Sequence, residues 1–68
     1  MKERIARLDQ SAINDIQIHL EIATENESGS GDHWLLMAVL DKYGFRTNSP
    51  SQCMDIAERI IVEWYNLR

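Results

Sequence analysis

The segment that decides the fold is residues 49–67, which read SPSQCMDIAERIIVEWYNL. Ser49 can cap a helix N-terminus, Pro50 suits the first helical position, and Gln52 completes a Ser-x-x-Gln capping box. With about 100° of rotation per residue, the apolar side chains of this segment fall within one arc of a helix. They are Cys53, Ile56, Ala57, Ile60, Trp64 and Leu67. The segment therefore predicts an amphipathic helix over residues 50–66.

A second helix is predicted over residues 32–43, with Asp32 as its N-cap. Gly44 supplies the stop because glycine tolerates the left-handed conformation in which many helices end. The run 34–40 is apolar on every side, and its Leu, Met and Ala residues favour a helix over a strand. A helix of this kind is usually covered on several sides, so we expect it to be the central helix.

The first segment of the chain fits two structures. As a helix it has one apolar face, with Ile13 at the edge of that face. The members of the face are Ile5, Leu8, Ala12, Ile16, Leu20 and Ala23. Residues 16–22, however, alternate apolar and polar side chains, which is a strand pattern. Such a strand would have to pair across a dimer, because no second strand is visible in the chain.

The helical interpretation leaves Ile18 and Ile22 on a second face, away from the main stripe. Apolar area left in water costs roughly 25 cal/mol per Å², so two β-branched side chains there indicate a docking patch for another protein. With this helix the fold is a small all-α, three-helix domain. With the strand it is a ribbon-helix-helix dimer.

The chain has 68 residues, and its seven Lys and Arg against eleven Asp and Glu give a net charge of −4. This length suits one small domain, residues 1–68. Its basic residues are scattered, apart from a weak corner of Lys2, Arg4 and Arg7, which argues against direct nucleic-acid binding. The longest apolar run, seven residues, is far short of the roughly 20 of a membrane span. The lone Cys53 and the lack of a secretory signal predict a cytoplasmic protein without a membrane partner.

No residue pattern indicates a catalytic, cofactor or metal site. His19, His33 and Cys53 lack the spacings of a zinc site, and Cys53 lies on the core stripe of its helix. Glu25 and Glu27 lie in a predicted loop, where nothing would hold them in catalytic geometry. We expect the aromatic side chains to lie in the core rather than to form a stacking platform; they are Trp34, Tyr43, Phe45, Trp64 and Tyr65. We therefore expect neither an enzyme nor a bound cofactor or metal.

The N-terminal part of the chain, IARLDQS at residues 5–11 and INDIQIHL at 13–20, resembles the theta subunit family of bacterial DNA polymerase III. That family reads LAKLDQT and MDKVNVDL over these stretches. The identical residues are Ala6, Leu8, Asp9, Gln10 and Leu20. His19 replaces an acid, which departs from the family pattern. The resemblance covers about 20 of the 68 residues, with a weaker echo at Pro50 and at residues 58–61.

The resemblance implies a three-helix accessory subunit without catalytic activity of its own. A phage or plasmid is one source that we consider for its gene, and the sequence leaves a chromosomal source open as well. Theta-like proteins bind and stabilise the proofreading 3′–5′ exonuclease subunit of the polymerase core. The resemblance also implies that the first segment is helical. The partner-binding residues expected on this basis are Leu8, Asp9, Gln10, Ile13, Gln17, Ile18 and Ile22.

Two alternatives stay open at this point. In a ribbon-helix-helix regulator, residues 16–22 would form the ribbon, and the segments 32–43 and 50–66 would form the two helices. Against this, the ribbon would present Glu21 to DNA, where its charge would repel phosphate. An acidic, phage-type inhibitor that docks on a nucleic-acid enzyme through complementary charge also fits the composition. The backbone conformation of residues 17–21 separates the first alternative from the theta-like hypothesis.

Overall fold

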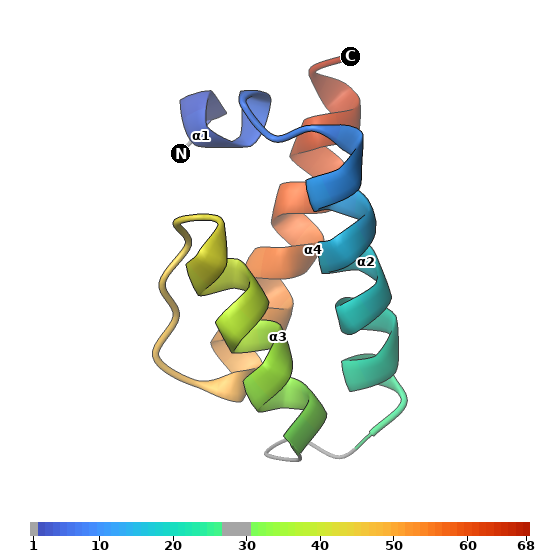
Figure 1. Cartoon of the computed structure of the whole chain (residues 1–68), viewed down its shortest axis with the longest axis vertical. Helices are drawn as coiled ribbons and strands as arrows, with labels where there is room; N and C mark the ends of the chain where they lie inside the picture. The colour runs from blue at the N-terminus through green and yellow to red at the C-terminus, as the bar shows by residue number, and fades with distance from the viewer. Residues whose placement is uncertain (1, 27–30) are drawn as a thin grey trace.

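The computed structural model describes residues 2–26 and 31–68. Over these ranges the chain forms helices α1 (Lys2–Ala6), α2 (Gln10–Thr24), α3 (Gly31–Lys42) and α4 (Pro50–Asn66), and no strand. Helix α3 packs against both α2 and α4, while α1 packs against α4 and lies across one end of the bundle (Figure 1). The all-α prediction is confirmed. The ribbon-helix-helix alternative is wrong, because residues 16–22 lie inside α2.

The first segment is two helices rather than one, because Asp9 interrupts it. The Asp9 backbone is extended, and its carboxylate Oδ1 accepts a hydrogen bond from the Ala12 backbone N–H at 2.8 Å. An aspartate side chain satisfies the free N–H groups of a helix start better than it supports a helix interior. Helix α1 therefore stops after Ala6, and the chain turns at Arg7 and Leu8 before α2 begins.

The last helix follows its sequence pattern closely, and its predicted bounds are confirmed. Ser49 Oγ accepts a hydrogen bond from the Gln52 backbone N–H at 3.2 Å, as the capping box requires. The Gln52 side chain in return accepts from the Asn48 N–H at 2.7 Å, one residue earlier than in the usual box. Of the predicted stripe, Ile56 is only half-buried and Leu67 is exposed.

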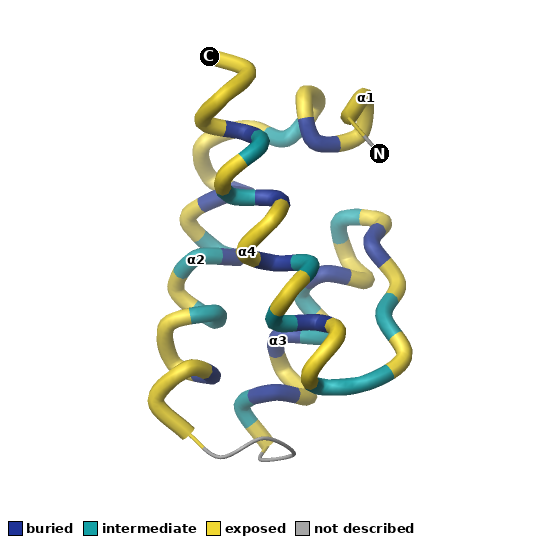
Figure 2. Tube along the Cα trace, turned by 180° about the vertical axis from the view of Figure 1, so that it is seen from behind, coloured by how far each residue is buried: buried dark blue, intermediate teal, exposed yellow. Residues whose placement is uncertain are grey.

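The core lies where α2, α3 and α4 meet, and buried positions alternate with exposed ones along these helices (Figure 2). Helix α1 adds Ile5, and the α3–α4 loop adds Phe45. The other core members are Ile13, Ile16, Ala23, Leu36, Leu40, Cys53, Ala57, Ile60 and Trp64.

The prediction of a helix at residues 32–43 is confirmed, but the prediction that this helix is central and covered on several sides is wrong. The helix exists, and Gly44 with its φ of +91° ends it as expected. Asp32 lies in the first turn rather than at the cap. Trp34 and Leu35 are each 56% exposed, because α3 is covered only on the side where Leu36 meets α2 and α4. With three long helices there is no position enclosed on every side.

The expectation that all the aromatic side chains lie in the core is therefore correct only in part. Trp64 and Phe45 are buried, Tyr43 is half-buried, and Trp34 and Tyr65 are at least half exposed.

Candidate partner-binding surface

Two hydrogen bonds between side chains clamp α2 and α3 together at the two ends of their contact. The Tyr43 hydroxyl donates to Asp15 Oδ2 at 3.0 Å, and the Asn26 amide donates to Asp32 Oδ2 at 2.8 Å. The helices are thus antiparallel neighbours, as Figure 1 also shows. Because the two clamps fix the antiparallel register, the turn of α2 that carries Ile22 lies at about the level of the turn of α3 that carries Leu35.

The outer face of α2 carries a stripe of two isoleucines and two glutamates. Ile18, Glu21 and Ile22 of α2 and its C-cap Glu25 are spaced at i, i+3, i+4 and i+7, and the helical backbone conformation of Glu25 keeps all four on one side. Ile18 is 54% exposed and Ile22 is 42% exposed, while the opposite side of α2 is buried. The prediction that Ile18 and Ile22 point away from the core is confirmed. We call these four residues together with Leu35 the α2–α3 face.

The α2–α3 face is acidic as well as apolar. No Lys or Arg occurs between Arg7 and Lys42, so neither α2 nor the first eleven residues of α3 carry a basic side chain other than histidine. Within the described part of the chain, no cationic side chain lies within ion-pair distance of Glu21 or Glu25. Both carboxylates are exposed to solvent beside the isoleucines.

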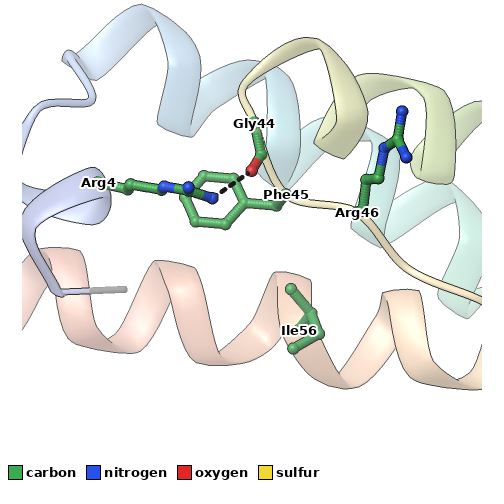
Figure 3. A pocket seen from close by; sticks show the side chains of 5 residues that line it. All are labelled: Arg4, Gly44, Phe45, Arg46 and Ile56. Carbon is green, nitrogen blue, oxygen red and sulfur yellow. Dashed lines mark hydrogen bonds between the residues drawn. The ribbon is translucent and has the colours of Figure 1, made fainter.

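Basic residues gather instead at the end of the bundle where α1 lies. The Arg4 guanidinium donates to the Gly44 carbonyl at 3.0 Å and so ties α1 to the loop after α3. These two residues line a hollow of about 390 Å³ together with Phe45, Arg46 and Ile56 (Figure 3). Arg46 points away from Arg4 and lies 3.5 Å from Asp41 Oδ1. The two guanidinium groups therefore do not converge on one anion.

The seven residues predicted to bind a partner do not form one surface. Ile13 is completely buried, so its prediction as a partner contact is wrong. The sequence pattern puts Ile13 at the edge of the apolar face, whereas in the structure its side chain belongs to the core. Asp9 is exposed but serves as the cap of α2. The Leu8 carbonyl accepts a hydrogen bond from Trp64 Nε1 at 2.8 Å. Gln10 donates to Asn14 on the exposed first turn of α2.

Gln17 lies one turn before Glu21, at the edge of the stripe, and is half-buried where Ile18 and Ile22 are exposed. Leu35, in contrast, was missed by sequence reasoning. The run 34–40 is apolar throughout, so its pattern does not distinguish the exposed side of α3 from the buried side.

Cys53 and His19 are engaged in contacts within the fold. The Cys53 thiol is buried and donates to the Pro50 carbonyl at 3.1 Å, and burial raises the pKa of Cys53 above its ordinary value. His19 Nδ1 lies 2.8 Å from the Asp15 carbonyl oxygen. Across residues 2–26 and 31–68, no three His, Cys, Asp or Glu side chains are grouped so that they could hold a metal ion.

Comparison of the chain with protein-family models, with curated proteins and with solved structures gave no match. In the described ranges, no helix is both long and apolar enough to cross a membrane.

Proposed function

We propose that this chain is a non-catalytic accessory protein of the cytoplasm that binds and stabilises a protein partner through the outer face of α2. The observation that carries the proposal is the exposure of Ile18 and Ile22 on a helix whose core side is already filled by Ile13 and Ile16. Exposed apolar area costs roughly 25 cal/mol per Å². Covering it with a partner would recover that free energy.

The N-terminal resemblance to the theta family supports a particular partner, the proofreading 3′–5′ exonuclease of a bacterial replicative polymerase. In that family the stretch matching residues 16–20 is helical, and the resemblance implies that Ile18 and Ile22 face the partner. The corresponding stretch of this chain belongs to α2 and has Ile18 outward, which is compatible with the same use.

The test is a calorimetric titration of the full chain with a bacterial proofreading exonuclease domain, run beside thermal melts. Wild type should bind, and Ile18→Asp should reduce the affinity by roughly a hundredfold or more, because a carboxylate buried without a partner costs several kcal/mol. Its melting should barely change, since position 18 is exposed.

The matched control is Val62→Asp, because Val62 is 58% exposed on α4 and lies away from the α2–α3 face. This variant should bind like wild type. Absence of binding by wild type, or equal binding by Ile18→Asp, would contradict the proposal.

A further inference from the structure

We infer that the segment of the partner that covers the α2–α3 face is a basic amphipathic helix, with apolar side chains for Ile18, Ile22 and Leu35 and with Lys or Arg for Glu21 and Glu25. This inference deepens the proposed function and rests on it. It specifies the chemistry of the partner from the surface that the partner would cover.

The first step is the charge of the face. Glu21 and Glu25 alternate with the two isoleucines along α2, and no cationic side chain of the described chain pairs with either of them. A partner with acidic side chains at these positions would be repelled. A partner with basic side chains gains from charge complementarity, which improves both the selectivity and the rate of association.

The comparison with α4 shows that this arrangement is not a general property of the surface. The outer side of α4 also has an exposed aliphatic residue, Val62, among the acids Asp55 and Glu58. There, however, Arg59 lies in the same group and its Nε is 3.3 Å from Glu63 Oε1. The face of α4 therefore has an arginine among its acids, whereas the stripe on α2 has no Lys or Arg.

The second step is the shape of the occupant. The α2–α3 face consists of one row of side chains along α2 with Leu35 of α3 beside it, and it offers no strand edge to which an extended segment could hydrogen-bond. A helix satisfies its own backbone hydrogen bonds and needs only a matching row of side chains. From Ile18 to Glu25 the face extends about 10 Å at 1.5 Å per residue, so about two turns of a partner helix would cover it.

The test uses the full chain and a synthetic peptide as the probe. The peptide has about 14 residues, with Leu at i, i+3, i+4 and i+7 and Lys elsewhere, and its counterpart has Glu in place of every Lys. Fluorescence anisotropy of the labelled peptide measures the affinity, and amide chemical shifts locate the binding surface. We expect the Lys peptide to bind with shifts confined to α2 and α3, and the Glu peptide not to bind.

Charge-matched variants separate this face from general attraction to an acidic protein. Glu21→Lys combined with Glu25→Lys changes the net charge as much as Asp55→Lys combined with Glu58→Lys on α4. The α2 pair should weaken the Lys peptide at least tenfold, and the α4 pair less than twofold. Ile18→Ser with Ile22→Ser should also weaken it at least tenfold. Circular dichroism checks that each variant is folded.

Several results would overturn the inference. Equal weakening by the two charge pairs would mean non-specific attraction, and equal binding of the Glu peptide would remove the charge argument. Sedimentation that shows a dimer, lost on Ile18→Asp, would mean that a second copy of the chain covers the face.

The exonuclease titration distinguishes failure of this inference from failure of the proposed function. If the exonuclease binds wild type and the Glu21→Lys, Glu25→Lys variant equally while Ile18→Asp abolishes binding, the function stands and the inference fails. If wild type ignores the exonuclease but binds the Lys peptide at α2 and α3, the inference about the face stands and the exonuclease assignment fails.

Discussion

The two tryptophans illustrate how differently one residue type is used in this chain. Trp64 is 3% exposed, and its Nε1 donates to the Leu8 carbonyl at 2.8 Å. The Arg68 guanidinium lies 3.9 Å from the centre of the Trp64 ring, so the end of α4, the linker before α2 and the C-terminal residue meet at one indole. Trp34 is 56% exposed on α3. The first indole therefore holds the fold together, and the second does not.

We expect Trp64→Phe to destabilise the protein by roughly 2 kcal/mol, because it removes ring volume from the core and the hydrogen bond to Leu8. Trp34→Phe is the matched control and should change the stability by less than about 0.5 kcal/mol. Urea unfolding followed by far-ultraviolet circular dichroism measures both. Similar losses for the two variants would show that the Leu8 contact has no stabilising role.

Cys53 should be inert in the folded protein, because burial encloses its thiol and raises its pKa, which disfavours the reactive thiolate. A thiol reagent such as Ellman's reagent should label it only as the chain unfolds in urea. Cys53→Ser should cost about 1–2 kcal/mol, since a more polar group replaces the thiol in the core. Fast labelling of the native protein would contradict the burial of this residue.

The helices themselves are delimited by side chains at their starts. Asp9 and Ser49 both have extended backbones, and both accept a hydrogen bond from the N–H three residues later. Each residue ends the preceding loop and starts a long helix. The second of these starts can be tested with little disturbance of the packing, because its hydrogen bonds lie at the surface.

Ser49→Ala should lower the stability by about 1 kcal/mol, because the Gln52 N–H loses its acceptor. Ser51→Ala makes the same chemical change two residues later, inside the first turn of α4, where the serine is exposed. This control should have a small effect. Thermal melts of the two variants measure the difference, and coincident melts would place the functional cap elsewhere.

At the scale of the whole molecule, the contact between α2 and α3 presents the candidate surface, and one of its clamps responds to pH. The hydrogen bond from Tyr43 to Asp15 favours the neutral phenol, and partial burial adds to this, so the pKa of Tyr43 is raised above its usual 10.0. The clamp therefore stabilises the fold below about pH 10. Its contribution disappears as the pH rises through the higher pKa of the folded state.

A Tyr65→Phe background isolates Tyr43 as the remaining tyrosine. In this background the tyrosinate absorbance should appear at a higher pH than after the further change Asp15→Asn, which removes the charge of the acceptor. Alkaline unfolding should shift in the same direction. Identical titrations with and without Asp15→Asn would mean that the clamp does not form in solution.

Part of this architecture could be read from the chain itself. Helix α4 has a cap, a proline at its first position and an apolar stripe on one side, and these local signals agree with each other, so its bounds were predictable. The same periodicity placed Ile18 and Ile22 on the outer side of α2 once a helix was assumed. Local signals suffice where each residue's neighbours along the helix already define its environment.

Other features were decided only by the packing. The run 34–40 is apolar on all sides, so the exposure of Trp34 and Leu35 depends on where α2 and α4 lie. Ile13 is buried because its side of α2 faces the core, although its sequence position suggested an edge. That Ile22 and Leu35 lie at about the same level depends on the register of α2 against α3, which two hydrogen bonds between these helices fix. The sequence pattern determines which side of a single helix is apolar. The surface that two helices form together depends on how they are aligned against each other, and the packing of the core sets that alignment.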